Sequence, residues 1–327
     1  MYRACQALQY VGEGLKAYSP YKHWPKGYRL GTATRAARLP SLAAIRQAHA
    51  HSRRPLPKPY LGGRESAGPM STVRVVVLAS SSAGNSTLVE TGEGAFLVDA
   101  GLSARETERR LLLAGAHPRE LRAIVLTHEH IDHVRGVRVL ARRHGLEVLG
   151  TTGTLRAAMP AMGAHGARPM GLGDPFDVAG AAVELLPVPH DAADPAAVLV
   201  EASGRRVLVA TDLGHVPQVL MDRARDLDAL VLESNHDVRM LMEGPYPEVL
   251  KKRILSPWGH LSNEACARGL RALIGPRTRA VLLGHLSQHN NTEVLALSTV
   301  RGIVKGGVPD DLDIRATSPT RIEPIRL

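Results

Sequence analysis

The chain has 327 residues, enough for two domains or for one large domain with an appendage. Hydrophobic residues make up 44% and charged residues 22%, and no uninterrupted apolar stretch approaches the roughly 18 residues that a membrane span needs, so we expect no contact with a membrane. The two cysteines, Cys5 and Cys266, exclude a disulfide framework and a paired-cysteine metal site, and they fit a reducing cytoplasm.

The formal net charge of +10 is confined to the start of the chain. Residues 1–70 hold 12 Lys and Arg against 2 Asp and Glu, while the rest of the chain holds 29 of each sign. We therefore place a boundary near Met70, between a basic extension (1–70) and the main domain (71–327). Within the extension we predict a short helix over Leu42–Ala50 and disorder over Arg53–Met70.

Three interpretations of this extension compete: a basic nucleic-acid arm, an organelle transit peptide, or upstream sequence translated from a start codon placed too early. We favour the last, because Met70 directly precedes the first credible strand.

From Val73 onward, strands and helices alternate to the end of the chain. The predicted strands are Val73–Leu78, Thr87–Glu90, Ala95–Val98, Ile124–Leu126, Val183–Leu186, Ala197–Val200, Val207–Ala210, Leu230–Glu233 and Ala280–Leu283. The predicted helices are Leu102–Ala114, Val134–His144, Val216–Ala224, Leu261–Ile274 and one that starts near Asn291. This order predicts an α/β protein with layered sheets.

Three histidines and an aspartate crowd the segment that follows the strand ending at Leu126, in the run Thr127-His-Glu-His-Ile-Asp-His133. In extended backbone His128 and His130 point the same way and can hold one ion, while Asp132, with the last histidine of the run, can reach a second. At this chain's composition such a run is expected by chance on the order of once in a thousand sequences. The run therefore predicts a metal site.

A site for two metal ions needs further ligands from other strand ends. His190, Asp212 and His285 each follow an apolar run, and one carboxylate between two cations is what such a site requires. Each position also has a plainer interpretation: a loop histidine for His190, a helix cap for Asp212, and competition from His260 and His289 for His285.

Together, these residues over 71–327 resemble the metallo-β-lactamase superfamily. Asp99 in Leu97-Val-Asp-Ala-Gly101, the run His128–His133, His190 and Asp212 follow the motifs of that superfamily in order. The resemblance implies a four-layer αβ/βα sandwich with a two-metal site between the sheets, and it implies that Asp99 orients ligands by hydrogen bonds. It does not favour a β-lactamase, because zinc β-lactamases typically carry a cysteine where Asp212 stands.

Four short motifs narrow the resemblance to the YycJ/WalJ-like group, described as cytoplasmic metallohydrolases of the 5′-exonuclease type. They are Ser82-Ala-Gly-Asn-Ser86, Glu233-Ser-Asn-His-Asp237, Gly259-His-Leu-Ser-Asn263 and His285-Leu-Ser-Gln-His-Asn-Asn291. The last two are also similar to motifs of the β-CASP nucleases, which implies a phosphate contact for His260 and metal ligation for His285. Gly259 follows Asp212 by only 47 residues, too few for a β-CASP insertion.

The resemblance implies a hydrolase that cleaves DNA or another phosphodiester from a 5′ end, with a hydroxide bridging two Zn²⁺ or Mn²⁺ ions. We expect one ion on His128, His130 and His190, a second on Asp132, His133 and His285, and Asp212 between them. We expect catalytic roles for Asp132 and Asp212, and for His260 or His236 as the acid that protonates the leaving oxygen. The expected substrate contacts are Ser82, Asn85, Ser86, Asn235, His260 and Ser262.

Three alternatives stay open: a glyoxalase II-like or lactonase-like thioester or ester hydrolase, a small-molecule phosphodiesterase, and a metal-dependent regulatory protein that has lost its chemistry. The last is disfavoured, because all seven expected ligands are of the right type. Lys251–Arg253 and Arg142–Arg143 are candidate contacts to a nucleic-acid backbone, although the electrically neutral main domain is not typical of a tight non-specific DNA binder.

Overall fold

The computed structural model describes residues 8–9, 16–17, 73–163, 166–306 and 308–327, and the chain divides into two units, Met1–Glu65 and Ser66–Leu327. In the first unit the described residues form a short antiparallel pair, β1 (Leu8–Gln9) and β2 (Lys16–Ala17). The predicted helix over Leu42–Ala50 and the predicted disorder over Arg53–Met70 lie outside the described residues.

Two seven-stranded sheets build the second unit, and in each sheet an antiparallel meander continues into parallel strands. The first sheet has the order β16-β3-β4-β5-β6-β7-β8. Its strands are β3 (Arg74–Ala79), β4 (Ser86–Thr91), β5 (Gly94–Val98), β6 (Leu121–Val125), β7 (Glu147–Gly150), β8 (Ala167–Pro169) and β16 (Glu323–Arg326). The last strand thus pairs with the first strand of this sheet, antiparallel to it.

The second sheet has the order β15-β14-β13-β12-β11-β10-β9. Its strands are β9 (Phe176–Val178), β10 (Ala181–Pro187), β11 (Ala196–Ala202), β12 (Arg205–Ala210), β13 (Ala229–Glu233), β14 (Ala280–Gly284) and β15 (Asp313–Ala316). Strands β12 to β15 run parallel to one another, and β10 runs in the same direction because two antiparallel steps separate it from β12.

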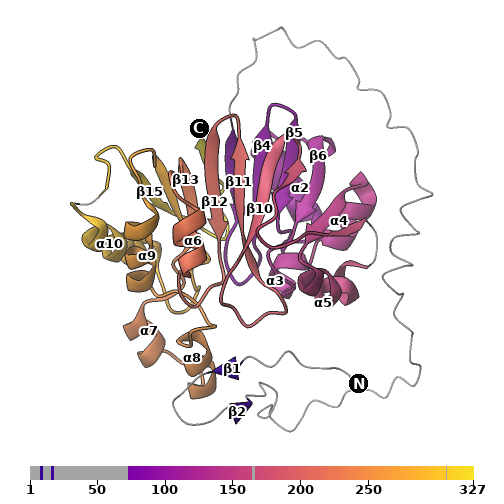
Figure 1. The fold of residues 1–327 in the computed structure, drawn as a ribbon. Coiled ribbons are helices and arrows are strands. Elements are labelled where there is room, and N and C mark those ends of the chain that lie inside the picture. The colour runs from indigo at the N-terminus through magenta and orange to yellow at the C-terminus, as the bar shows by residue number, and fades with distance from the viewer. Residues whose placement is uncertain (1–7, 10–15, 18–72, 164–165, 307) are drawn as a thin grey trace, which may run out of the picture. The chain divides into compact units, whose positions relative to one another are not determined.

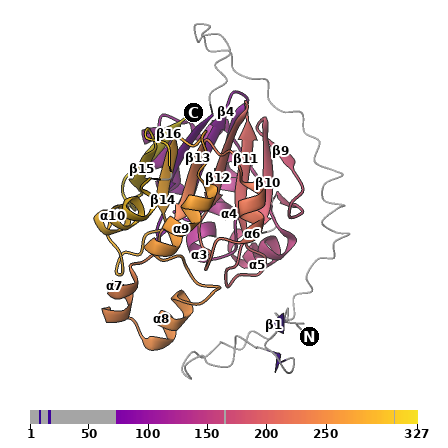
Figure 2. The ribbon, with the colours of Figure 1, turned by 60° about the vertical axis from the view of Figure 1, so that its left-hand side comes forward.

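Helices cover the outer face of each sheet (Figures 1 and 2). The helices beside the first sheet are α2 (Ala104–Leu113), α3 (Ile131–Val134), α4 (Val137–His144) and α5 (Thr152–Met162), with a 3₁₀ turn at Pro118–Glu120. Those beside the second sheet are α6 (Gln218–Arg223), α9 (Asn263–Leu273) and α10 (Glu293–Val304). Two short helices, α7 (Val238–Glu243) and α8 (Glu248–Ile254), project below the strands in both views.

The alternation of side chains along the strands produces three apolar layers. In β3, Val75 and Val77 join the core between the two sheets, while Val76 and Leu78 join the core beneath α2, α4 and α5. A third core lies between the second sheet and its helices. Because both faces of each sheet are covered, the strands are almost continuously apolar. The four-layer αβ/βα sandwich expected from the resemblance is confirmed.

Most predicted elements are present with ends shifted by a few residues, but one prediction was wrong. The single helix predicted over Val134–His144 is broken into α3 and α4 at Gly136. A Cβ at Gly136 would lie 2.4 Å from the carbonyl oxygen of Leu102, so the chain makes a close backbone contact there. The segment from Asp212 to Gly259 contains only α6, β13, α7 and α8, so it holds no inserted domain. Among the described residues, none of the helices is long and apolar enough to cross a membrane.

Candidate metal centre

The side chains singled out in the sequence meet at one edge of the two sheets, where strands of the same direction end. Asp99 follows β5, the segment His128–His133 follows β6, Asp212 follows β12 and His285 follows β14, while His190 lies beyond the end of β10. This placement follows the general rule that ligands of α/β sheets bind beyond the carboxyl ends of the strands.

Three of these residues turn the chain sharply in the left-handed region of backbone conformation. The φ angles are 60° at Asp99, 61° at Asp212 and 53° at His285. Such conformations in non-glycine residues cost on the order of 1–3 kcal/mol each and persist only where surrounding contacts enforce them. Here the backbone N–H of Thr127 donates to Asp99, and that of His285 donates to Ser80 Oγ over 2.7 Å. Among the described residues, six non-glycine residues have a positive φ angle, and three of them belong to the candidate site.

The first group of donors consists of His128, His130 and His190. His130 Nδ1 lies 3.1 Å from His128 Nε2 and 3.3 Å from His190 Nε2, so three ring nitrogens converge. The remote nitrogens of two rings have other partners: Nδ1 of His128 is 3.0 Å from Thr127 Oγ1, and Nδ1 of His190 is 3.2 Å from the carbonyl oxygen of Gly259. These contacts fix the rings with Nε2 toward the centre of the group.

The second group consists of Asp132, His133 and His285. Asp132 Oδ2 lies 3.7 Å from His133 Nε2 and 3.8 Å from His285 Nε2. On the far side of its ring, His133 Nδ1 is 2.7 Å from Asp99 Oδ2, which places Asp99 behind the ligand as the resemblance implies. Asp99 also accepts hydrogen bonds from the backbone N–H and hydroxyl of Thr127.

Asp212 lies between the two groups. Its carboxylate is 3.2 Å from His133 Nε2, 3.2 Å from His285 Nδ1 and 3.9 Å from His190 Nε2. It is 2% exposed, so a charge there needs compensation by neighbouring positive charge. The structure thus brings together all seven side chains that the sequence predicted as ligands.

The electrostatics of the centre favour cation binding. Burial lowers the pKa of His128 and His190, so both rings are neutral and offer a lone pair. Burial also lowers the pKa of His133, but the charges of Asp99 and Asp212 outweigh it and raise that pKa well above its ordinary value. Burial raises the pKa of Asp212, yet the charges of His285 and His133 hold it well below its usual range. The carboxylate is ionised, and the raised pKa of His133 shows that its surroundings attract positive charge, which a bound cation would supply in place of a proton.

Two candidate metal-ligand atoms of the centre are buried without a hydrogen-bond partner among the described residues. They are Asp212 Oδ2 and His285 Nε2, each facing the space between the ligand groups. Buried polar atoms without partners are rare in folded proteins, and divalent cations would satisfy an imidazole nitrogen and a carboxylate oxygen at these positions. The residues present therefore fit a metal centre.

Glu233 ends the fully buried strand β13 and was not predicted as a site residue. Its Oε1 accepts from Nδ1 of His285 over 2.7 Å and from Nδ1 of His260 over 2.9 Å. Its Oε2 accepts from the backbone N–H groups of Leu261 and Leu213. Burial raises the pKa of Glu233, but the neighbouring histidines lower it to about 2. The available signal in the sequence was an acidic residue ending a wholly apolar strand.

His260 stands beside both ligand groups, with its ring centroid 5.1 Å from that of His190 and 5.2 Å from that of His285. Burial lowers its pKa, but the charge and hydrogen bond of Glu233 outweigh this and raise it. His236 differs, because it is buried and neither of its ring nitrogens has a partner among the described residues. Burial lowers the pKa of His236 to about 4, so its ring is neutral at pH 7. Of these two candidate acids, His260 is the one whose surroundings favour the protonated form.

Several predicted substrate contacts are engaged in supporting the centre. The amide of Asn85 is 3.0 Å from His133 Nε2 and 3.4 Å from Asp132 Oδ2. Ser86 Oγ donates to the carbonyl oxygen of Asp99, and Asn235 Nδ2 donates to that of His285. These three side chains are buried, and their hydrogen bonds hold the ligand loops.

The remaining predicted contacts lie at the surface or at a helix end. Ser82 is exposed in the loop between β3 and β4. Ser262 caps α9, its hydroxyl accepting from the backbone N–H of Ala265 over 3.2 Å. Of the predicted substrate contacts, therefore, Ser82, His260 and Ser262 keep surface that a ligand can reach.

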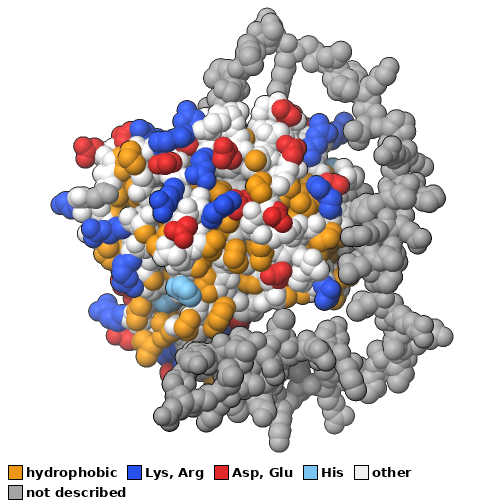
Figure 3. Space-filling view, viewed as in Figure 1, with side chains coloured by type: hydrophobic (Ala, Val, Ile, Leu, Met, Phe, Trp, Pro, Cys, Tyr) orange, Lys and Arg blue, Asp and Glu red, His pale blue; other side chains and the backbone are white. Residues whose placement is uncertain are grey.

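Three of the basic residues proposed as contacts to a nucleic-acid backbone already have partners. Lys251 is buried and donates to the carbonyl oxygen of Met242. Arg253 pairs with Asp191, and Arg143 pairs with Glu108. On the face shown in Figure 3, basic and acidic side chains are interspersed, and no large area of one sign is visible. This agrees with the neutral charge balance of the main domain.

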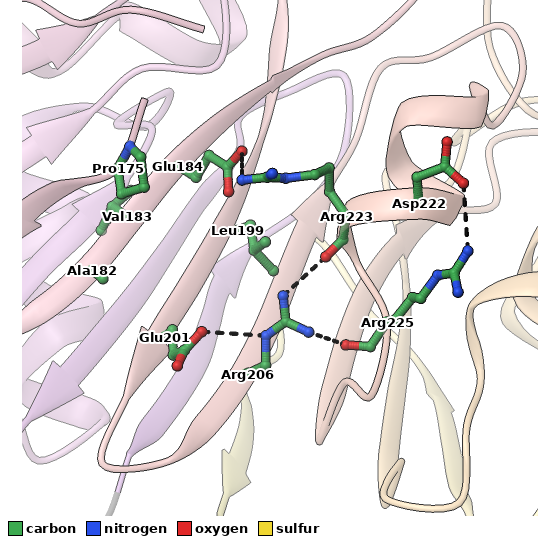
Figure 4. A pocket seen from close by; sticks show the side chains of 10 residues that line it. All are labelled: Pro175, Ala182, Val183, Glu184, Leu199, Glu201, Arg206, Asp222, Arg223 and Arg225. Carbon is green, nitrogen blue, oxygen red and sulfur yellow. Dashed lines mark hydrogen bonds and ion pairs between the residues drawn. The ribbon is translucent and has the colours of Figure 1, made fainter. Parts of the chain in front are cut away.

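A separate surface pocket of about 420 Å³ lies over β10, β11, β12 and α6 (Figure 4). Its three arginines are paired: Arg223 with Glu184, Arg206 with Glu201 and with backbone carbonyls, and Arg225 with Asp222. The pocket shares no lining residue with the metal centre, and its charges cancel internally.

Known proteins of one superfamily are similar to this chain in sequence. A family model described as the beta-lactamase superfamily domain matches residues 95–285. The chain is 35% identical to exodeoxyribonuclease WalJ of Streptococcus pneumoniae over 257 residues, which are 76% of this chain and 96% of that protein. It is 37% identical to exodeoxyribonuclease YycJ of Bacillus anthracis over 249 residues, 74% of this chain and 94% of that protein.

Among solved structures, the crystal structure of the metallo-β-lactamase fold protein YhfI from Bacillus subtilis is similar in fold. The TM-score is 0.60 at 15% sequence identity, and the match covers 78% of this chain and all of that one. The residues matched by the family model, 95–285, include Asp99 and every predicted ligand from His128 to His285.

Proposed function

Because the chain belongs to the beta-lactamase superfamily, and within it to the family of the exodeoxyribonucleases WalJ and YycJ, we propose that it is a metal-dependent hydrolase that removes nucleotides from a 5′ end of DNA. The observation that carries this proposal is the convergence of seven side chains with ligand atoms. Two of these atoms, Asp212 Oδ2 and His285 Nε2, are buried without a hydrogen-bond partner among the described residues.

His128, His130 and His190 would hold one divalent ion, and Asp132, His133 and His285 would hold a second, with Asp212 shared between them. When bound, two such cations bring the pKa of a water molecule toward neutrality and neutralise charge that develops on the phosphoryl oxygens. Five imidazoles suit Zn²⁺, while the carboxylates and a phosphate substrate also suit Mn²⁺.

His260 would act on the leaving group. Its Nδ1 is hydrogen-bonded to Glu233, which fixes the ring and stabilises its protonated form, so that Nε2 carries the proton to be donated. A proton delivered to the departing oxygen of the DNA chain avoids the release of an alkoxide. Glu233 thus acts through His260 and His285, as a positioning residue.

Asn85 and Asp99 would keep the second group of ligands in place. Asp99 orients the ring of His133, and Asn85 contacts the ligand atoms of Asp132 and His133. Hydrogen bonds to ligands of this kind fix the tautomer and the orientation of the donor atoms. We place the reaction in the cytoplasm, where DNA and reduced cysteines such as Cys266 occur together.

The test is a comparison of Asp212→Ala with Asp177→Ala, an exposed aspartate on the edge strand β9. We expect Asp212→Ala to lose DNA cleavage and to retain fewer than two metal ions per chain by elemental analysis, while Asp177→Ala behaves as the wild type. An active, fully metallated Asp212→Ala variant would contradict the assignment. Cleavage of a thioester, lactone or small phosphodiester without cleavage of DNA would keep the centre but change the substrate.

A further inference from the structure

An exposed tryptophan stands at the rim of the metal centre. Trp258 is 52% exposed, and it is the only tryptophan among the described residues. It lies in the turn between α8 and α9, two residues before His260. Nothing in the centre described above uses its side chain.

The backbone of this turn is bound directly to the ligand loops. The carbonyl oxygen of Trp258 accepts from the backbone N–H of Asp191 over 3.1 Å, and the next carbonyl, that of Gly259, contacts His190 Nδ1. On the other side, a Cβ added to Gly214 would lie 2.1 Å from the carbonyl oxygen of Pro257. The turn is therefore packed between the loop that carries His190 and the loop that carries Asp212.

Further bonds hold the turn in one conformation. The backbone N–H of Gly259 donates to the carbonyl oxygen of Ser256 over 2.9 Å, and that of His260 donates to the carbonyl oxygen of Ile254 over 3.0 Å. The Arg253 side chain pairs with Asp191 across the same junction. The backbone that carries the exposed indole is thus held in place. Stacking of a planar ligand on the ring therefore costs little conformational entropy of the protein.

The charge pattern of the domain indicates which chemistry such a platform serves. The main domain is neutral overall, and Lys251 and Arg253 on the neighbouring helix already have partners, so these two side chains offer little free charge to a nucleic acid. Stacking of an aromatic ring on a base needs no charge and tolerates every sequence, because every base has a π face. A contact of this kind therefore suits an enzyme that removes successive nucleotides whatever their sequence.

We propose that the indole of Trp258 stacks on a nucleobase beside the phosphodiester that is cleaved, and so positions the DNA end over the metal centre. This inference rests on the proposed function, since it assigns to Trp258 a part of the same substrate. Trp258 is a binding and positioning residue, and the chemistry stays with the side chains around Asp212.

The experiment measures metal-dependent cleavage by the full-length protein and three variants. Trp258→Ala removes the ring, Trp258→Phe keeps a smaller ring, and Leu113→Ala is the matched control. Leu113 is also an exposed apolar residue, 64% exposed, at the end of α2 next to the contact between Arg74 and the carbonyl oxygen of Ala114. Each protein is assayed on labelled DNA and on the same DNA with abasic tetrahydrofuran residues flanking the cleaved bond.

On ordinary DNA we expect Trp258→Ala to lose about tenfold in kcat/KM, mainly through a raised KM, which is within the range measured for base–aromatic stacking. Trp258→Phe should retain most of the activity, and Leu113→Ala all of it. On abasic DNA the wild type and Trp258→Ala should agree within about twofold, because neither can stack there.

Equal losses by Trp258→Ala on both substrates would assign the residue a structural role and overturn the inference, as would full activity of this variant on ordinary DNA. Wild-type protein that cleaves neither substrate would overturn the proposed function, and the inference with it. Cleavage of ordinary DNA by the wild type, with no advantage over abasic DNA, would overturn the inference alone.

Discussion

Replacing Glu233 with Gln tests how the metal centre is held together. Both carboxylate oxygens of Glu233 accept hydrogen bonds. Oε1 accepts three, from His260, His285 and the backbone N–H of Asp212, and Oε2 accepts two, from the backbone N–H groups of Leu213 and Leu261. Glutamine has the same shape but only one acceptor oxygen. In either orientation, its NH₂ group faces at least two donors.

The two orientations have different consequences. With the NH₂ group toward Leu213 and Leu261, two buried N–H groups lose their acceptor, at about 1–3 kcal/mol each, or about 2–6 kcal/mol together. For a unit of this size that corresponds to a fall in Tm of about 6–18 °C. With the NH₂ group toward the histidines, His285 must carry its proton on Nε2, and that nitrogen can then no longer bind a metal.

The assay combines thermal unfolding with metal analysis of the purified protein. We expect Glu233→Gln to unfold at lower temperature or to lose metal, and in both cases to lose activity. Glu184→Gln is the control, because Glu184 is also buried but pairs with a single exposed partner, Arg223, and we expect a change in stability below about 1 kcal/mol. A Glu233→Gln variant with wild-type Tm, metal content and activity would contradict the role of Glu233 in holding the metal centre together.

Four further predictions follow from the structure and the sequence. Removal with EDTA of a metal that was present at about a thousandfold excess over its Kd should lower the free energy of unfolding by about 4 kcal/mol. Calorimetry would detect this loss as a lower Tm, and an unchanged Tm would argue against bound metal. Gly101→Ala should abolish cleavage and metal binding, because a Cβ there would lie 1.5 Å from the carbonyl oxygen of Asp132; normal metal content of this variant would contradict the expectation. Hydrogen bonds from Arg109 and Arg110 lower the pKa of Glu106 to about 2. The stability that this carboxylate contributes is therefore present above its ordinary pKa of 4.5 and is lost as the pH falls toward 2. In an acid titration followed by circular dichroism, the stability of Glu106→Gln should depend less on pH than that of the wild type. Deletion of residues 1–69 should leave cleavage by the main domain unchanged, and a loss of activity would favour a nucleic-acid arm.

Patterns local in the sequence predicted nine of the strands of the second unit, more than half of its helices and the side chains that converge on the candidate centre. The run from His128 to His133, and the polar residues that end other apolar strands, could be located because strands of one direction end at the same edge. Five short strands were missed, since three or four residues carry too little periodicity to recognise. They are Glu147–Gly150, Ala167–Pro169, Phe176–Val178, Asp313–Ala316 and Glu323–Arg326. The pairing of Glu323–Arg326 with the first strand of the sheet depends on contacts between the two ends of the main domain.

The supporting residues of the centre were harder to predict. Glu233 has its role because loops carrying His260, His285 and Leu213 converge on it, and such convergence exists only in the folded chain. Asn235 was expected to contact substrate, yet its amide is bonded to the carbonyl oxygen of His285. A polar residue beside a ligand has the same appearance in the sequence whether it faces the substrate or the protein.

The most direct test of the central claim is the release of nucleotides from end-labelled double-stranded and single-stranded DNA by the full-length protein, with Mn²⁺ or Zn²⁺ added. We expect release from the 5′ end that EDTA abolishes and that Asp212→Ala lacks. No release with either metal, from a protein that carries two ions per chain, would contradict the nuclease assignment.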